Sequence, residues 1–130
     1  MKDTSIETNP ILKLTFSFAL EIIEYCEKLD DIRKFNLSNQ LFKSGTSIGA
    51  NANEAQDAES KADFIHKFKI AAKEMKETKY WLLLCKHSRS YPDSDFLLQK
   101  LNEIEKVINK IIATSKRKNP VSYFFSFFIF

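Results

Sequence analysis

The chain has 130 residues, a formal net charge of +3, 44% hydrophobic residues and 28% charged residues. That length fits a single domain with a modest core of its own, and the composition is typical of globular proteins. Only two glycines and three prolines are present, which is too few for a turn-rich β-fold. The sequence therefore predicts an all-α protein.

Localisation is indicated by the cysteines and by hydropathy. Cys26 and Cys85 are far apart and form no CxxC pair, which favours reduced, packed cysteines over a disulfide framework. The segment Met1–Pro10 is polar and lacks the apolar run of a secretory signal. No stretch reaches the roughly 17–25 apolar residues that span a bilayer. We therefore expect a cytoplasmic protein with no membrane span.

The first long helix is expected from Pro10 to about Asp31, because proline suits a first helical turn, and the polar residues before it are expected to be frayed. Its expected inward seam alternates steps of four and three: Leu12, Phe16, Ala19, Ile23 and Cys26. Phe18 and Ile22 lie outside this seam, so the helix is apolar over most of its circumference. We expect these two residues to contact another subunit.

The second helix is expected after a short connection at residues 32–36, and it contains the two glycines, Gly45 and Gly49. Each costs about 1 kcal/mol of helix propensity relative to alanine, and their spacing of four places both on one helix face. This pattern favours a tight helix crossing, with a local loop or kink at Gly45 as the alternative. We expect this helix to end near residues 58–60.

The inward side of the second helix is small and polar. It is expected to contain Leu37, Leu41, Ser44, Ile48, Asn51 or Ala52, and Ala55. If buried, Ser44, Ser47 and Asn51 would need hydrogen-bond partners, because an unsatisfied polar group costs about 1–3 kcal/mol.

The third helix is expected to begin after Ser60, in a pattern close to a capping box with Asp63, and to end near Ser88. It has the most regular seam in the chain: Phe64, Phe68, Ala71, Met75, Thr78, Leu82 and Cys85. Its last third is apolar all round. We therefore add Tyr80, Trp81 and Leu84 to the expected oligomer interface.

A turn at residues 91–94 precedes the fourth helix, with Asp93 or Ser94 as N-cap, and this helix is expected to end near residues 114–116. Its seam is Leu97, Leu101, Ile104, Ile108 and Ile111. Four amphipathic helices with short links predict an antiparallel up-down-up-down four-helix bundle over residues 1–115. Residues 116–130 form a basic, aromatic tail that packs on its own bundle or on a neighbouring subunit, lies at a membrane interface, or is a poorly ordered extension.

Two stretches of the second and third helices are distinctive. The first is QLFKSGTSI at residues 40–48, with Asn51, Glu54 and Ala55; the second is SKADFIHK at residues 60–67, with residues 69–74 and 77–82. Both resemble the bacterial four-helix bundle family named for open reading frames in 23S rRNA intervening sequences. The helix-packing motif in this resemblance comprises Ser44, Gly45, Ser47, Ile48, Gly49, Asn51, Glu54 and Glu77.

The resemblance implies a single four-helix bundle that assembles as a homopentamer and has no assigned biochemical activity. A relative of the family, the accessory variability determinant of diversity-generating retroelements, binds nucleic acid and a reverse transcriptase, so both are expected partners. Two departures are notable. Lys43 replaces the arginine of many members, which keeps the charge but loses a bidentate fork. Ala55 replaces a glycine, which suggests that the second helix continues further.

No catalytic constellation is found. His66 and His87 form no HExxH or ExxH pair, and residues 45–49 lack the Gly-Lys-Ser/Thr ending of a phosphate loop. Glu54 and Glu77 form either an acid pair or, as we favour, bonds to Lys, Ser or Asn between the second and third helices. We therefore expect no enzymatic activity, no metal and no cofactor.

Charge is distributed unevenly along the chain. Residues 60–90 contain eight Lys or Arg and three acidic residues, whereas residues 10–31 contain two lysines and five acidic residues. The candidate nucleic-acid-binding residues are Lys43, His66, Lys69, Lys73, Lys76 and Lys79. A row of lysines on one helix face is also typical of a solvated face, or of pairing with an acidic helix of another subunit. We expect an oligomeric RNA- or DNA-associated accessory protein, with a protein-binding scaffold as the alternative.

Overall fold

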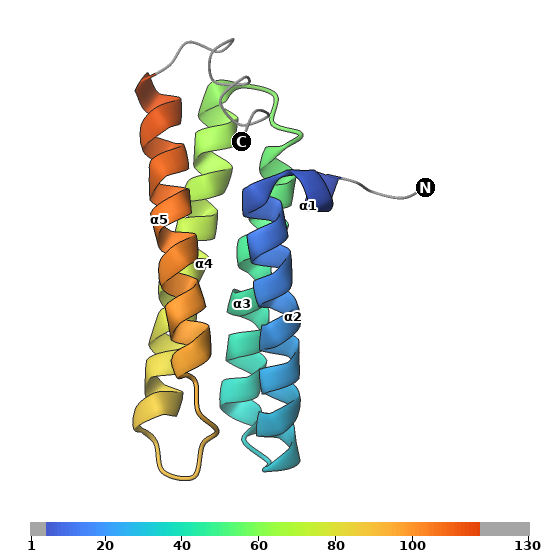
Figure 1. Cartoon of the computed structure of the whole chain (residues 1–130), viewed down its shortest axis with the longest axis vertical. Coiled ribbons are helices and arrows are strands. Elements are labelled where there is room, and N and C mark those ends of the chain that lie inside the picture. The colour runs from blue at the N-terminus through green and yellow to red at the C-terminus, as the bar shows by residue number, and fades with distance from the viewer. Residues whose placement is uncertain (1–4, 118–130) are drawn as a thin grey trace.

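A computed structural model describes residues 5–117 of the chain. This part forms five helices and no strands: α1 (Ser5–Thr8), α2 (Pro10–Asp31), α3 (Phe35–Ala55), α4 (Lys61–His87) and α5 (Asp95–Arg117). The four long helices run alternately up and down (Figure 1). In the bundle α2 packs on α3, α3 on α4, α4 on α5 and α5 on α2, so α2 and α4 occupy opposite corners. The prediction of an all-α antiparallel four-helix bundle is confirmed.

The described part of the chain begins with a short helix and ends with the last turn of α5. Residues 5–8, predicted to be frayed, instead form the short helix α1, which packs on α2 with Ile6 half buried. Of the predicted tail, residues 116–117 are the last turn of α5. Residues 118–130 lie outside the part of the chain that the structure describes.

Local hydrogen bonds set where α2 begins and ends. The Asn9 side chain accepts a bond from the Ile11 N–H at 3.2 Å, and Pro10 occupies the first turn. At the other end the Lys34 N–H donates to the Leu29 carbonyl and the Arg33 N–H to the Asp30 carbonyl. With Arg33 at φ 63°, this is a Schellman ending. It turns the chain directly into α3, so the connection is shorter than the sequence predicted.

Later helix boundaries also depend on caps. Ser60 accepts a bond from the Asp63 N–H, as the near capping box predicted, although the Asp63 carboxylate accepts from the Glu59 N–H rather than from Ser60. At the start of α5, Asp93 accepts from the Asp95 N–H. The Ser94 hydroxyl is buried and donates to the Leu82 carbonyl of α4, so it joins two helices.

The predicted ending of α3 is wrong by a few residues. The helix stops at Ala55, short of residues 58–60. The next three N–H groups, at residues 56–58, each donate to the carbonyl three residues earlier, which tightens the last turn. Ala55 therefore does not extend the helix, contrary to the expectation drawn from the resemblance.

The seams of α4 and α5 were predicted correctly. All seven α4 positions and all five α5 positions are buried, as are most of those predicted in α3. The seam of α2 was predicted in the wrong rotation. Its buried residues are Ile11, Leu12, Thr15, Phe18, Ile22, Tyr25, Cys26 and Leu29.

The rotation of α2 is explained by the two glycines of α3. A Cβ on Gly45 would lie 2.9 Å from both Cγ1 and Cγ2 of Ile22, and one on Gly49 would lie 3.2 Å from Thr15 Oγ1. The Ile22 and Thr15 side chains therefore fill the space that alanines would occupy. Because α3 is continuous through this region, the predicted tight crossing is confirmed and the kink is excluded.

The polar groups of α3 are satisfied within the bundle. The hydroxyls of buried Ser44 and Thr78 are hydrogen bonded at 2.9 Å, which joins α3 to α4. Ser38 donates to the Cys26 carbonyl, which joins α3 to α2. Ser47 and Asn51 are only half buried and donate to carbonyls one turn earlier in their own helix. The buried side of α3 therefore contains polar residues without the penalty of an unsatisfied hydrogen-bonding group.

We predict that Gly45→Ala destabilises the protein although alanine is the better helix former. The added methyl conflicts with fully buried Ile22, an overpacking that costs about 1–3 kcal/mol and outweighs the roughly 1 kcal/mol gained in helix propensity. Urea unfolding followed by circular dichroism measures the change. Ile22→Ala in the Gly45→Ala background is the control, because it removes the conflict and should cost less than in the wild type. A Gly45→Ala variant more stable than wild type contradicts the close packing.

Candidate nucleic-acid interface

The outer face of α4 presents the predicted row of basic side chains. Lys69, Lys73 and Lys76 recur at three- and four-residue spacing, and all three are exposed; we call them the α4 lysine face. At 1.5 Å per residue they span about 10 Å of the helix. His66 is also exposed, one turn earlier on this face. The buried α4 seam points into the bundle, which leaves this row facing outward.

The charges of the α4 lysine face are not used for packing. Three ion pairs join helices in the described residues: Lys67 with Glu54 at 3.2 Å, Lys86 with Asp95 at 3.0 Å, and Lys100 with Glu21 at 2.5 Å. None of them involves Lys69, Lys73 or Lys76. These three ammonium groups are therefore available to an external anion.

Two acidic side chains border the α4 lysine face: Glu74, one turn before the Thr78 that bonds to Ser44 of α3, and exposed Glu77, four residues after Lys73. Burial raises the pKa of Glu74, and repulsion from Glu77 raises it further, whereas Lys73 lowers it. Glu74 therefore interacts electrostatically with both Glu77 and Lys73. These two carboxylates make their side of the α4 lysine face less favourable for an anion.

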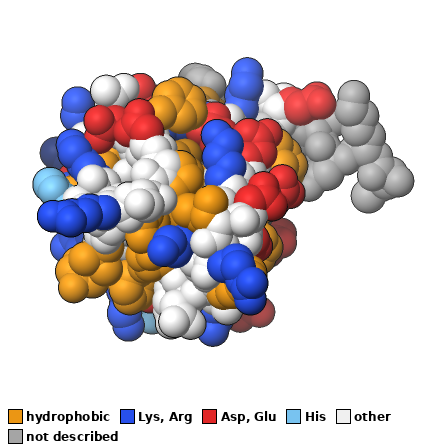
Figure 2. Space-filling view, turned by 90° about the horizontal axis from the view of Figure 1, so that it is seen from below, with side chains coloured by type: hydrophobic (Ala, Val, Ile, Leu, Met, Phe, Trp, Pro, Cys, Tyr) orange, Lys and Arg blue, Asp and Glu red, His pale blue; other side chains and the backbone are white. Residues whose placement is uncertain are grey.

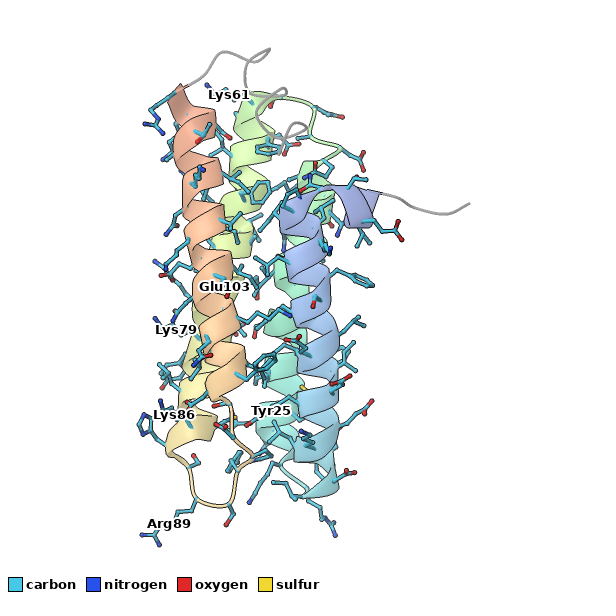
Figure 3. All side chains as sticks on the ribbon, viewed as in Figure 1. Tyr25, Lys61, Lys79, Lys86, Arg89 and Glu103 are labelled. Atoms are coloured by element: carbon cyan, nitrogen blue, oxygen red, sulfur yellow. The ribbon has the colours of Figure 1, made fainter. Side chains whose placement is uncertain are left out.

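Two other predicted basic residues are exposed but lie off this row. Lys79 and Lys86 lie on the side of the bundle away from α2 (Figure 3). Lys79 is two turns before Lys86, which pairs with Asp95 of α5, so Lys79 is on the α5 side of α4. Lys43 is on α3, next to Ser44 and therefore near the level of Thr78. These two lysines widen the basic surface without extending the row.

The exposed aromatic side chain of Tyr80 continues the row by one more turn. Tyr80 follows Lys76 by four residues and is 58% exposed, and Leu83 and Leu84 beside it are exposed as well. The centroid of its ring lies 5.4 Å from the centroid of the Trp81 ring, in an edge-on arrangement. Trp81 itself is half buried. The end of α4 therefore joins a basic surface to an apolar one.

Part of the predicted oligomer interface is wrong. Phe18 and Ile22 are both fully buried inside one molecule, because the glycines of α3 draw this side of α2 inward. The residues turned outward instead are Phe16 at 45% and Leu20 at 49% exposure, with Phe42 of α3 at 45%. Phe42 precedes Gly45 by three residues and lies beside the stripe that contacts α2. We call Phe16, Leu20 and Phe42 the α2–α3 apolar face.

The other side of α2 forms a polar contact with α5. Lys100 donates to the Ser17 hydroxyl at 2.7 Å and to Glu21 at 2.5 Å. Next to this contact is a shallow hollow of about 200 Å³, lined by Phe96, Gln99, Lys100 and Glu103. Hydrophobic side chains also reach the surface at the end of the bundle where α2 joins α3 and α4 joins α5 (Figure 2). Apolar side chains therefore reach the surface beside α5 and at this end of the bundle as well.

The motif acids do not form a pair with each other. Glu54 binds Lys67 of α4, as favoured from the sequence, and Glu77 is exposed.

Across residues 5–117 no three His, Cys, Asp or Glu side chains are grouped as a metal site would require. None of the helices in that range is both long and apolar enough to cross a membrane.

Comparison with known proteins identifies the family. A family model described as 23S rRNA-intervening sequence protein matches residues 7–110. The chain belongs to this family. A solved structure of a protein of unknown function from the S23 ribosomal protein family of Bacteroides thetaiotaomicron VPI-5482 is similar in fold, with a TM-score of 0.75 and 38% identity. The match covers 78% of this chain and 97% of that one. No curated protein matches.

The two cysteines are packed rather than arranged for chemistry. Both are buried, and Cys26 Sγ lies 3.5 Å from the Ser38 carbonyl oxygen. Burial raises the pKa of Cys26 to about 11 and also raises that of Cys85. Tyr25, whose hydroxyl donates to the Pro92 carbonyl, lies between α2 and the α4–α5 pair (Figure 3), and burial raises its pKa too.

We predict that neither cysteine is alkylated in the folded protein at about pH 8, because the reactive thiolate is scarce and shielded there. Mass spectrometry after iodoacetamide treatment measures the labelling. The control is the same protein in urea, where both thiols should react readily. Rapid labelling of native protein contradicts the inert packing of Cys26 and Cys85.

Proposed function

We propose that the protein is a non-enzymatic, self-associating bundle that binds RNA or DNA through the outer face of α4. The observation that carries this proposal is the α4 lysine face: three aligned, exposed lysines without an ion pair to any described residue. Charge segregation supports it. Helix α4 contains seven lysines and three acidic residues. Helix α2, at the opposite corner, contains two lysines and five acidic residues.

Such a face suits a phosphate backbone better than a specific base sequence. Lysine is a flexible point charge without the rigid planar fork of arginine, so the expected contacts are mainly to phosphates. Phosphate contacts release counterions and make binding strongly dependent on salt. The proposed binding is therefore weakly sequence-selective, and it suits an accessory protein that acts on nucleic acid together with another protein, such as a reverse transcriptase.

Self-association is supported by the apolar surface around α2. Soluble monomers rarely expose large contiguous apolar patches, and the α2–α3 apolar face has three large side chains that are nearly half exposed. A closed ring requires each copy to present two different faces. We propose that the α2–α3 apolar face of one copy meets the hollow beside Phe96 of the next, and that five copies close the ring, as the family resemblance implies.

The positions of the helices make these two roles compatible. Because α2 and α4 lie at opposite corners of the bundle, contacts around α2 leave the outer face of α4 uncovered. A ring would then repeat the α4 lysine face once per copy on its outer side. Repetition of a weak site raises the overall affinity by avidity when one strand reaches several copies.

The competing function is a protein-binding scaffold without nucleic acid. The exposed apolar residues favour it, since they would also accept a protein partner. In that case the lysines are a solvated face, and salt would have little effect on binding. The two functions therefore differ in a measurable way.

We predict that a Lys69/Lys73/Lys76→Gln variant binds oligonucleotides much more weakly. With about three phosphate contacts per copy, wild-type affinity should fall tens-fold between about 50 mM and 200 mM salt, and the variant should lose most of that dependence. Fluorescence anisotropy measures both. Lys28/Lys106/Lys116→Gln is the matched control, because it removes three exposed lysines from surfaces outside the α4 lysine face and the α2–α3 apolar face. No binding by wild type at low salt, or an equal loss in the control, disproves the proposal.

We also predict that Leu20→Glu lowers the mass of the assembly. The new carboxylate would be buried without a partner in the ring contact, which is strongly unfavourable. Light scattering coupled to size-exclusion chromatography measures the mass. Ala50→Glu, at an exposed position of α3 away from the α2–α3 apolar face, should leave the mass unchanged. A stable wild-type monomer at micromolar concentration rules out the ring.

A further inference from the structure

We infer that the nucleic acid bound by α4 is single-stranded, with the exposed ring of Tyr80 stacked on an unpaired base beside the phosphates held by the α4 lysine face. This inference rests on the proposed function and specifies its ligand. A lysine row alone would serve any phosphate backbone. The exposed aromatic ring in the same row is what distinguishes one class of ligand.

Helix geometry places the ring in line with the charges. Tyr80 is four residues after Lys76 and seven after Lys73, so all three lie on one face of α4. Over the eleven residues from Lys69 to Tyr80 the helix rises about 17 Å. That length accommodates a segment of a few nucleotides, with phosphates along the lysines and one base at the end.

The surroundings of Tyr80 support a stacking role. The Trp81 ring packs edge-on against the Tyr80 ring, with 5.4 Å between the ring centroids and an interplanar angle of 68°. This contact supports the Tyr80 ring from one side. Leu83 and Leu84 are 36% and 37% exposed and provide apolar surface on either side. A large ring held this way, 58% exposed and not covered by its own bundle, has a π-face available to a partner.

A single strand fits this combination better than a duplex. In a duplex the base faces are covered by their neighbours, so only the phosphates would contact α4. In a single strand every base has a free π-face, and stacking on an aromatic side chain is tolerant of sequence. An exposed tyrosine at the end of a lysine row therefore contributes only when the ligand has unpaired bases.

The two acidic side chains bias the path of the strand. Glu74 lies one turn before Thr78, which is hydrogen bonded to Ser44 of α3, and exposed Glu77 is four residues after Lys73. Their negative charges would repel phosphates on this side of the lysines. The stripe of Lys69, Lys73 and Lys76 is therefore the favoured path of the backbone. Tyr80 then meets the strand at the end of that stripe.

The test compares labelled oligonucleotides of about 12 nucleotides, one single-stranded and one duplex, by fluorescence anisotropy at low salt. Wild type should bind the single strand more tightly. Tyr80→Ala should weaken that binding about 10-fold and leave duplex binding unchanged, and Tyr80→Phe should retain it, because the ring rather than the hydroxyl stacks. Phe35→Ala, which removes an aromatic side chain of similar exposure from another surface, should have no effect.

The outcomes separate the inference from the proposed function. Equal binding of both oligonucleotides with no effect of Tyr80→Ala overturns the inference but leaves the lysine site intact. A Tyr80→Ala variant that loses both ligands equally also overturns it, because stacking predicts a selective loss. No binding of either oligonucleotide overturns the proposed function and the inference together.

Trp81, the one tryptophan of the chain, adds a second readout. A base stacked on Tyr80 should change the fluorescence emission of Trp81.

Discussion

The close approach of α3 to α2 at Gly45 and Gly49 is the constraint on which the rest of the structure depends. Where a Cβ would stand at Gly45, the side chain of Ile22 is already present, and Thr15 fills the same role at Gly49. This contact fixes the rotation of α2 about its axis. It places Phe18 and Ile22 in the core and leaves Phe16 and Leu20 on the surface. One pair of glycines thus determines which apolar surface the protein presents to other molecules.

Helix α4 lies on the other side of α3 and leaves one face free. With α2 and α3 tightly joined, α3 meets α4 through the Ser44–Thr78 hydrogen bond, and α4 buries a single regular seam. Its opposite face has no structural duty within the bundle. Exposed lysines without ion pairs and an exposed tyrosine can stand there at little cost in stability. The surface around α2 and the surface of α4 are therefore free to serve different partners.

Sequence reasoning predicted the helices that have one regular apolar seam. The seams of α4 and α5 follow from period alone, and so does the alignment of Lys69, Lys73 and Lys76. It failed for α2, because a helix apolar around most of its circumference fits several seams equally well. The choice is made by the partner: the glycines of α3 accept Ile22, and sequence spacing does not say which residue they meet. The role of the Ser94 hydroxyl in joining α5 to α4 depends on the same kind of tertiary contact.

The central claim is that the outer face of α4, and not the acidic α2 corner, contacts nucleic acid. Lysine footprinting tests it most directly: brief acetylation of the intact protein with and without a single-stranded oligonucleotide, read by mass spectrometry at each lysine. The account predicts that acetylation slows at Lys69, Lys73 and Lys76 and is unchanged at Lys13 and Lys28 of α2. Uniform protection of all lysines, or protection confined to α2, would contradict it.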